Sequence, residues 1–556
     1  MSEAASIQPA SPGACFELTE LLEESVLAAV AAASRLTDGG RAIDEHQVVC
    51  ERVAYAATEL EAVRTMAGFA EAAAGAGHSD AALYAEQAAV VIGEVAGRVR
   101  AELALSAPDL GLDDASLVSG VGSDRALELL RDMTREDRVR AIGRQTAVTA
   151  GANNAWLPDE DAVMVRDSVR SFAAQEVAPL AERIHRHDEL VSDDIISSMA
   201  EMGYFGMAAP EPYGGLGMGN LPMIITTEEL SRASLAAAGS LITRPEILTK
   251  ALLKGGTEEQ KLKWLPQVCS GELMVAVSVT EPDIGSDVAS VACRAEPGQL
   301  DGQDGYLING AKAWCTFAGR ANVLALLART DPDPGAGARG LSLFIVEKDA
   351  FGGHEFEMRQ AGGGVLTGKA DATPGYRGMH SYTLGFENYF VPAENLVGEE
   401  AGKGKGFYLQ MGGFAAGRLQ TGGRASGLAQ AALEASASYA GERKQFGKPL
   451  IDFHLTQHKL GRMASWLEAA RRLTYRAALA MDEDESNSLE PAMAKLLACD
   501  IAVWLTQEGQ LLHGGWGYAE EYPISRYVID AQVLPIFEGV KPVLELKVIA
   551  RQLLAA

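Results

Sequence analysis

Several short patterns in this 556-residue sequence could bind or transform a small molecule, and a glycine motif is the most suggestive of them. Residues 335–340 read GAGARG, which fits the GxGxxG pattern of dinucleotide-binding loops. That pattern cradles a pyrophosphate only where it lies between a strand and the helix that follows. Here it follows the turn sequence DPDP and leads directly into the β-type run LSLFIVEK. It therefore predicts a hairpin loop and not a nucleotide site.

Motifs for metal binding or for a serine nucleophile do not stand out. The sequence contains no P-loop, no HExxH and no GxSxG. His185 and His187 lie two residues apart on a helical stretch, so their side chains do not share a face. The six cysteines are scattered without CxxC spacing, which is typical of reduced cysteines in a cytosolic protein. We therefore expect no metal site.

Six other segments resemble, in their order along the chain, the signature segments of the acyl-CoA dehydrogenase family. Each alone is a weak signal, whereas six in the same order form a strong one. The segments are TEPDIGSD at 280–287, NGAKAWCT at 309–316, GYRGM at 375–379 with VPAENL at 391–396, ERKQFGK at 442–448, HGGWGY at 513–518 and IFEG at 536–539. The resemblance implies an FAD enzyme that removes hydrogens from the α and β carbons of an acyl-CoA thioester.

That reaction needs a base for the α proton and a hydride acceptor at the β carbon, which flavin supplies. Glu538 matches the family's base, and Gly539 is expected to contact the substrate. Because Glu538 follows Phe537 in an apolar segment, we expect it to be desolvated rather than an ordinary surface carboxylate. Some family members carry the base just before an arginine of a C-terminal helix. Here that position is Gly417, before Arg418, and glycine cannot abstract a proton.

The resemblance also implies a cofactor site. Thr280 and Thr316 would hydrogen-bond the isoalloxazine ring and Trp314 would be its aromatic wall, whereas the alternative is that all three are residues of a β-core. Arg443 and Phe446 would reach the adenine half of FAD in a neighbouring subunit, which implies a homo-oligomer, either a dimer or a dimer of dimers. The expected cofactor-binding residues are Val277, Val279, Thr280, Trp314, Thr316, Arg443, Phe446, Leu511, Gly514 and Gly515.

On the substrate side, the resemblance implies that Ser286 contacts the acyl-CoA and that Arg418 anchors it. A substrate with a free carboxylate would also need a cation in the acyl pocket, because an unpaired buried carboxylate is very costly. Arg244, in SLITRPEIL, is the candidate for that cation. The alternative is a surface or helix-capping arginine.

The sequence departs from the family pattern at two places. After the Glu-Gly pair the family has Thr and Gln, but this chain reads Val540, Lys541 and Pro542. Leu511 stands where a cofactor-binding Gln is common, with Gln510 one position earlier. Both departures concern contacts to the adenosine diphosphate half of FAD.

The hydrophobic patterns that must position these residues change along the chain. They predict a mainly α fold with a central β-domain. The resemblance implies that this is the acyl-CoA dehydrogenase fold, with a helical domain, a β-barrel-like domain and a C-terminal four-helix bundle. The expected domains are an N-terminal helical extension (1–150), a helical dehydrogenase domain (151–274), the β-domain (275–398) and the helical bundle (399–556). Within the extension, residues 106–124 are rich in Pro, Gly, Asp and Ser and predict a linker.

The extension is absent from most members of the family. Its presence makes the chain similar in length to the methylsuccinyl-CoA dehydrogenases, which work in the ethylmalonyl-CoA pathway of bacterial acetyl-CoA assimilation. Residues 43–46 and 451–454 share the pattern Ile-Asp-x-His, a likeness that two Ala-rich helices can show by chance. We hypothesise that the extension is a helical bundle beside the C-terminal one.

Charge and hydropathy limit the partners. The 48 Lys and Arg residues against 75 Asp and Glu residues give a net charge of −27, which disfavours nucleic acid and anionic membranes. Neither a signal peptide nor a membrane-length apolar run is visible, so we expect a cytoplasmic protein.

We predict FAD-dependent oxidation of a short branched acyl-CoA, methylsuccinyl-CoA to mesaconyl-CoA, with electron transfer flavoprotein as acceptor. The alternatives are an acyl-CoA oxidase that reduces O₂, a different short-chain acyl-CoA dehydrogenase, and a non-enzymatic flavin-binding scaffold.

Overall fold

The structure, a computed structural model, describes residues 11–153 and 155–555. The chain forms two compact units, which we call the helical unit (Met1–Glu160 and Thr421–Ala556) and the mixed unit (Asp161–Gln420). Residues 1–10 of the predicted extension lie outside the described residues. The division into four domains stays a prediction.

Helices open the mixed unit, with π-helical turns at Ala173–Val177 and Leu235–Gly239. They are α7 (Glu160–Phe172), α8 (Ala178–His187), α9 (Asp193–Glu201), α10 (Asn220–Ala233), α11 (Thr243–Gly255) and α12 (Glu258–Cys269). At the start of α12, Gln260 N donates to Thr257 Oγ1 at 3.2 Å and Thr257 N donates to Gln260 Oε1 at 3.1 Å. This reciprocal cap satisfies two N–H groups that have no partner in the helix, and so fixes where α12 begins.

One eight-stranded sheet follows in the mixed unit, as the β-rich sequence predicts. Its strands are β1 (Val275–Ser278), β2 (Arg294–Leu300), β3 (Gln303–Thr316), β4 (Val323–Arg329), β5 (Leu341–Glu347), β6 (Glu355–Arg359), β7 (Val365–Ala370) and β8 (Ser381–Pro392). The order is β1-β4-β2-β3-β8-β7-β6, and β5 pairs with β4 off this path. The GAGARG sequence lies in the turn Pro334–Gly340 between the antiparallel strands β4 and β5, so it is the predicted hairpin loop.

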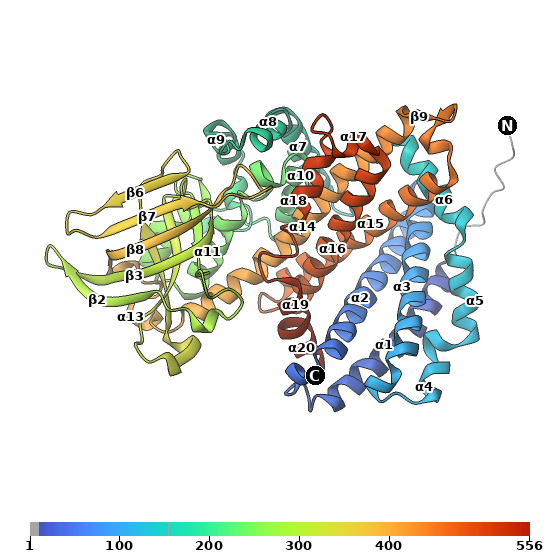
Figure 1. Cartoon of the computed structure of the whole chain (residues 1–556), viewed down its shortest axis with the longest axis horizontal. Coiled ribbons are helices and arrows are strands. Elements are labelled where there is room, and N and C mark those ends of the chain that lie inside the picture. Colours follow the sequence, from blue (N-terminus) through green and yellow to red (C-terminus); the bar gives the residue numbers. More distant parts are fainter. Residues whose placement is uncertain (1–10, 154, 556) are drawn as a thin grey trace. The chain divides into compact units, whose positions relative to one another are not determined.

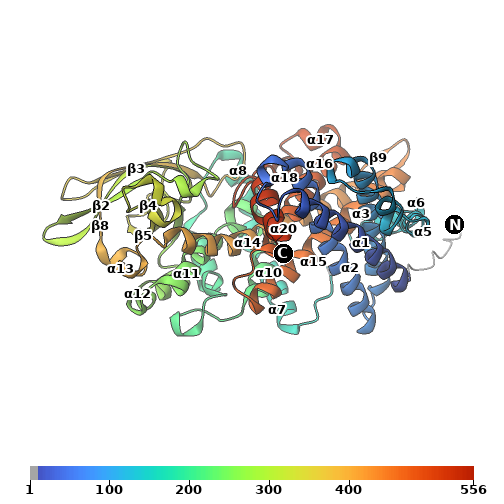
Figure 2. The same cartoon turned by 90° about the horizontal axis from the view of Figure 1, so that it is seen from below.

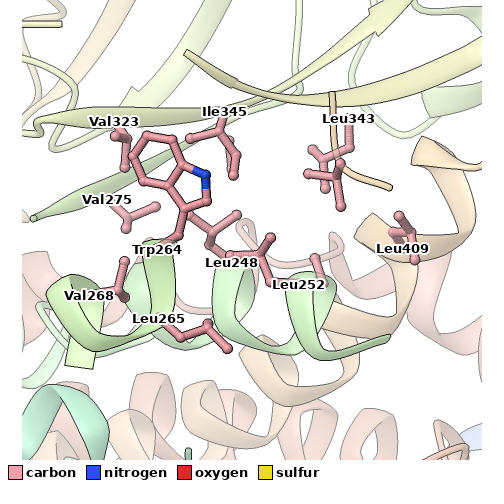
Figure 3. Packing of buried hydrophobic residues seen from close by; sticks show 13 residues of the cluster. Leu248, Leu252, Trp264, Leu265, Val268, Val275, Val323, Leu343, Ile345 and Leu409 are labelled. Carbon is pink, nitrogen blue, oxygen red and sulfur yellow. The ribbon is translucent and has the colours of Figure 1, made fainter. Parts of the chain in front are cut away.

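Helices α11 and α12 lie beside this sheet (Figure 2), and a hydrophobic cluster joins them to it (Figure 3). Trp264 on α12 lies against the sheet beside Leu248 of α11. The cluster also includes Leu252, Leu265, Val268, Val275, Val323, Leu343, Ile345 and Leu409. Every residue of β4 is buried, which explains why VLALLAR reads as a continuous run rather than an alternation. Burying each large apolar side chain contributes about 1.5–3 kcal/mol to this packing.

Long helices make up the helical unit, and α14 begins in the mixed unit. Those of the N-terminal extension are α1 (Pro12–Leu36), α2 (Gln47–Gly75), α3 (Ala81–Leu110), α4 (Asp114–Val118), α5 (Asp124–Met133) and α6 (Glu136–Val148). After α13 (Glu399–Gly402) in the mixed unit, the C-terminal helices are α14 (Gly406–Glu442), α15 (His454–Glu483), α16 (Leu489–His513), α17 (Gly515–Tyr518), α18 (Ile524–Ala531), α19 (Lys541–Val543) and α20 (Arg551–Ala555). A short ribbon, β9 (Lys444–Gln445) with β10 (Lys448–Pro449), precedes α15.

The extension packs on the C-terminal helices within the helical unit (Figure 1). Helices α2, α3 and α6 lie against α15, and α2 also contacts α16. Arg462 Nε and Trp466 Nε1 of α15 donate to Glu94 of α3 at 2.7 and 2.8 Å. Where α6 crosses α15, a Cβ on Gly143 or on Gly461 would collide with the backbone of the other helix. The hypothesis of a helical extension beside the C-terminal helices is therefore confirmed.

The predicted linker at 106–124 is wrong in part. Helix α3 continues through Pro108 to Leu110 and ends at Gly111, which takes the left-handed φ of 67° that glycine allows. Leu110 is buried, so tertiary packing extends the helix past its proline. The short helix α4 follows, and the Asp113 carboxylate caps it by accepting from Ser116 N at 2.9 Å.

Two further observations describe the chain as a whole. Over the described ranges, no helix combines the length and apolar character that crossing a membrane requires. All six cysteines are unpaired and buried, and burial raises the pKa of the Cys315 thiol to about 11. These thiols are therefore protonated at neutral pH and pack as small apolar groups.

Candidate active site

The first candidate site region, the strand half-site, lies in the mixed unit where β1 and β3 end. It contains Thr280, Trp314 and Thr316. The backbone N–H of Ala313 donates to Thr280 O at 2.8 Å, so the two sequence motifs are joined directly. The Thr316 hydroxyl lies 3.0 Å from the Ser381 hydroxyl on β8, and this hydrogen bond orients the Thr316 side chain. Thr280 is half-buried.

Trp314 stands out from its strand because the ladder between β3 and β8 shifts register beside it, between Lys312 and Cys315. The Trp314 backbone adopts a left-handed φ of 57°, and its side chain is 59% exposed. A left-handed non-glycine residue costs about 1–2 kcal/mol, so the surrounding strands must impose it. An exposed indole next to two threonine hydroxyls fits the apolar face and polar edge of an isoalloxazine ring.

A buried ion pair locks the two motifs together. Lys312 Nζ donates to Glu281 Oε1 at 2.9 Å and to Val279 O at 2.8 Å. The Glu281 carboxylate also accepts from the backbone N–H groups of Ala292 and Cys293, at 2.9 and 2.8 Å. Since both charged groups are buried and hydrogen-bonded, they hold the shape of the half-site. The sequence prediction missed this pair, although both residues lie inside the quoted motifs.

The remaining predicted residues of this region have different surroundings. Val279 is buried in a small cluster with Val291, while Val277 packs beside it and is half-buried. Ser286 is exposed in the turn after β1, where it can meet a ligand from solvent. Arg418, on α14, is half-buried.

Arg244 is only 5% exposed, which excludes the surface alternative. It lies in the first turn of α11, where a cation is unfavourable for the helix dipole. Among the described residues its guanidinium makes one hydrogen bond, from Nη1 to Ser240 O at 3.3 Å. A buried guanidinium carries five N–H donors, so this site has the capacity to bind a carboxylate. Nearby polar groups are paired with each other, since the Gln420 amide donates to Glu246.

The second region is the Glu538 loop, residues 532–540 between α18 and α19 in the helical unit. Glu538 is half-buried and takes a left-handed φ of 54°, and Gly539 follows with a φ of 98°. The loop is closed by a hydrogen bond from Lys541 N to Pro535 O at 3.0 Å. Lys495 Nζ of α16 donates to Gly539 O at 2.6 Å. Backbone strain of this kind gathers at functional sites, where neighbouring contacts maintain it.

A third region, the bundle pocket, is a cavity of about 570 Å³ in the helical unit. It brings together Arg443, Gly514 and Gly515, whereas Phe446 and Leu511 are exposed outside its lining. The other lining residues are Tyr439, Gln445, Leu450, Leu512, His513, Trp516 and Ala519. No ion pair involves the Arg443 guanidinium in the described part of the chain. A guanidinium beside successive glycines fits a phosphate-bearing group, as the predicted FAD contact requires.

Histidine 513 forms the inner wall of the bundle pocket. Its ring stacks on Tyr439 with 4.2 Å between centroids, and its Nδ1 lies 2.7 Å from Gly509 O. Burial lowers the pKa of His513, so the ring is neutral at pH 7 and carries its proton on Nδ1. Histidine 513 therefore adds an aromatic surface rather than a charge.

Two other features contain none of the predicted residues. A cavity of about 620 Å³ in the mixed unit is lined in part by Lys348, whose Nζ donates to the carbonyls of Gly319, Ala321 and Asp349 at 3.1, 2.7 and 2.6 Å. These three bonds use all donors of the ammonium group, which gives Lys348 a structural role.

The cluster of Asp188, His354 and His380 has ligand atoms within 4.8 Å of one another, a spacing that a metal ion could bridge. The Asp188 carboxylate, however, already contacts His380 Nε2 at 3.2 Å and Arg377 Nε at 3.1 Å. These contacts join α8 to the segment before β8, so the cluster has a structural explanation.

Comparison with known proteins gives consistent matches along most of the chain. Three family models match in order: the N-terminal domain of acyl-CoA dehydrogenase over residues 159–272, the middle domain over 276–389 and the C-terminal domain over 404–554. The chain is 38% identical over 531 residues to (2S)-methylsuccinyl-CoA dehydrogenase of Cereibacter sphaeroides, which covers 93% of each chain.

Solved structures agree with the family models. The glutaryl-coenzyme A dehydrogenase glutaryl-CoA complex matches with a TM-score of 0.65 and 32% identity, covering 72% of this chain and 97% of that one. A chain from a study of the electron transferring flavoprotein of Acidaminococcus fermentans matches with a TM-score of 0.63 and 31% identity, covering 71% and 98%. The family models thus span the region after the extension, and the Cereibacter match, which covers 93% of this chain, reaches into the extension as well.

Proposed function

We propose that this chain, which belongs to the acyl-CoA dehydrogenase family and is an FAD-dependent oxidoreductase, oxidises methylsuccinyl-CoA to mesaconyl-CoA. The observation that carries this proposal is the similarity to (2S)-methylsuccinyl-CoA dehydrogenase over 93% of both chains, which includes most of the N-terminal extension. The predicted fold is confirmed by the same comparisons.

Arg244 supports a substrate with a free carboxylate. Methylsuccinyl-CoA carries such a group at the end of its acyl chain, and burying it without a partner would cost several kcal/mol. We assign this carboxylate to the buried Arg244 guanidinium, whose single described hydrogen bond leaves donors for a ligand. Ser286 and Arg418 are assigned to the remainder of the thioester.

We assign the proposed reaction to residues of the Glu538 loop and of the strand half-site. Glu538 takes the α proton on its carboxylate, and Gly539 next to it contacts the thioester. In the strand half-site Thr280 and Thr316 orient the ring edge, Trp314 covers its face, and Val277 and Val279 shape the wall behind it. Bound FAD supplies the acceptor for the β hydride. The α proton becomes acidic only while the thioester carbonyl is polarised, so donors at that oxygen would stabilise the developing enolate.

For the other half of FAD, we assign Arg443 and the Gly514–Gly515 backbone in the bundle pocket to the phosphate-bearing end. Phe446 and Leu511 complete this predicted set as exposed apolar residues. Because the family shares this part of the cofactor between subunits, we propose a homo-oligomer, either a dimer or a dimer of dimers. We further propose a cytoplasmic location and electron transfer flavoprotein as the acceptor.

One substitution tests the substrate. We expect Arg244→Met to lower kcat/KM for methylsuccinyl-CoA by about 100-fold or more, because a buried charge loses its partner, and to change butyryl-CoA oxidation only slightly. Arg244→Lys should retain part of the activity. Arg294→Met, which removes an exposed arginine of β2, is the matched control and should leave both substrates unaffected.

The measurement is anaerobic flavin bleaching by a panel of acyl-CoA thioesters. Equal losses on the two substrates in Arg244→Met would rule out a carboxylate site at Arg244. Stoichiometric peroxide in the aerobic assay would instead identify an acyl-CoA oxidase. The absence of bleaching with every thioester would favour a non-enzymatic scaffold.

A further inference from the structure

The Glu538 loop is held by turn hydrogen bonds of its own, such as Phe537 N to Val533 O at 3.2 Å, and also by side chains from other helices. Glu538 has a left-handed backbone, which costs a non-glycine residue about 1–2 kcal/mol, and the loop contains no regular secondary structure. A base must stay within hydrogen-bond reach of the proton it removes. Contacts from other parts of the helical unit therefore help to keep Glu538 in position.

Two buried cations on the C-terminal helices contact the loop. Lys495 of α16 is 1% exposed and donates to Gly539 O, at the residue after Glu538. Arg424 of α14 is fully buried, and its guanidinium lies 4.6 Å from the centroid of the Phe537 ring. Phe537 and Gly539, the residues on either side of Glu538, thus each contact one of these two cations.

The end of the loop is held by the N-terminal extension. Lys541, the first residue after the loop, has its Nζ 2.6 Å from Asp500 Oδ2 on α16. The hydroxyl of Tyr55, on α2 of the extension, donates to the same oxygen at 2.9 Å. Lys541 Nζ also lies 4.9 Å from the centroid of the Tyr55 ring, within the range of a cation–π contact. Tyr55 therefore contacts both members of the ion pair.

The contact of Tyr55 with Lys541 bears directly on the loop, because the backbone N–H of Lys541 closes the loop by donating to Pro535 O. The titratable groups that face Lys541 and Tyr55 are Asp500, Glu545, Glu51 and Arg98. Burial alone would lower the pKa of Lys541, but the hydrogen bond and charge of Asp500 outweigh it, and the pKa is raised. Lys541 therefore remains a cation and keeps its attraction to Asp500 and to the tyrosine ring.

We propose that the N-terminal extension is a working part of the active site, in which Tyr55 positions the Glu538 loop through Asp500 and Lys541. The inference rests on the proposed role of Glu538 as the base. It unites two features that the family pattern does not explain, namely the extension itself and the Val540-Lys541-Pro542 departure. Tyr55, Asp500 and Lys541 are positioning residues, since they act through the loop and not on the substrate.

The proposal predicts a specific kinetic signature. A shift of about 1 Å in a reacting group can cost roughly 100-fold in rate without weakening substrate binding. We expect Lys541→Met to lower the limiting rate of anaerobic flavin reduction by about 10- to 100-fold, and Tyr55→Phe by a smaller factor, with little change in KM. Lys541→Arg, which keeps the cation, should restore most of the rate.

The matched control is Tyr84→Phe. Tyr84 lies on α3 of the same extension, is 4% exposed, and its hydroxyl accepts from Trp156 N at 3.0 Å, with no contact to the Glu538 loop. Its loss should lower the melting temperature but leave the limiting rate of flavin reduction unchanged. The double variant Tyr55→Phe/Lys541→Met should lose no more rate than Lys541→Met alone, because both act through one contact.

Glu538→Gln separates this inference from the proposed function. If Glu538→Gln abolishes flavin reduction while Tyr55→Phe and Lys541→Met behave like Tyr84→Phe, the extension is only structural and the inference is overturned. If Glu538→Gln reduces flavin at the native rate, the proposed function fails instead. The FAD content of each variant, read from its visible spectrum, shows that the holoenzyme is being compared.

Discussion

The strand half-site and the Glu538 loop maintain their geometry in different ways. In the strand half-site, Lys312 and Glu281 come from the same two sequence motifs that supply Thr280 and Trp314, and the strands carry them. The Glu538 loop instead depends on Lys495 and on Tyr55, which is nearly five hundred residues away in sequence. The residues that stabilise the strand half-site thus lie in its own sequence motifs, whereas those that stabilise the Glu538 loop lie on helices distant in sequence.

The largest effect should come from the loop itself. Glu538→Gln removes the proposed base while keeping the shape of the side chain, so we expect flavin reduction to slow by about 1,000-fold or more, at the upper end of what a positioned base contributes. Thermal stability and FAD content should stay close to those of the unmodified protein. Glu520→Gln, a change at an exposed carboxylate, is the control. Native-rate bleaching by Glu538→Gln would refute the assignment.

The strand half-site should respond to mutation mainly through stability. Lys312→Met leaves the Glu281 carboxylate buried without its charged partner, which should cost about 3–5 kcal/mol in the free energy of unfolding. Replacing both partners, as in Lys312→Met/Glu281→Met, should recover part of this loss. Denaturant unfolding of the FAD-free protein measures both variants. A loss in Lys312→Met no larger than that of an exposed pair such as Arg294–Glu296 would contradict the supporting role.

The smallest expected effect is a pH dependence of stability that differs between the helical unit and the strand half-site. Burial raises the pKa of Glu545 to about 7, with Glu51 and Asp500 adding to the effect and Lys541 opposing it. Because the folded pKa is above the unfolded one, the stabilisation is complete below pH 4.5 and is lost as the pH rises through 7. We expect the helical unit to lose up to about 3 kcal/mol between pH 5 and pH 8 from this group.

Hydrogen exchange at several pH values measures that loss in each region. Glu545→Gln should remove most of the pH dependence near the Glu538 loop and leave the strand half-site unchanged. A helical unit whose pH dependence is the same in Glu545→Gln would show that this carboxyl is not the group responsible.

Sequence reasoning succeeded where structure is local. The β-rich run, the hairpin loop at 335–340 and the helical extension are all present, because each depends on neighbouring residues. The linker expected at 106–124 was wrong at its start, because α3 continues through Pro108 to Leu110, which is buried. The site residues quoted from the motifs stay predictions, and their support at Lys495 and Tyr55 was not foreseen.

The amino-acid order alone determined the family, the cofactor and the identity of the chemical groups, since motif letters and spacing carry that information. Only the tertiary structure decided which distant groups share one carboxylate oxygen at Asp500, that Arg244 is buried, and that Trp314 is turned outward from its strand. Hydrophobic periodicity reports which face of an element is buried, but not which other element covers it. Contacts such as Tyr55 with Lys541 arise from helix packing, and no local pattern records them.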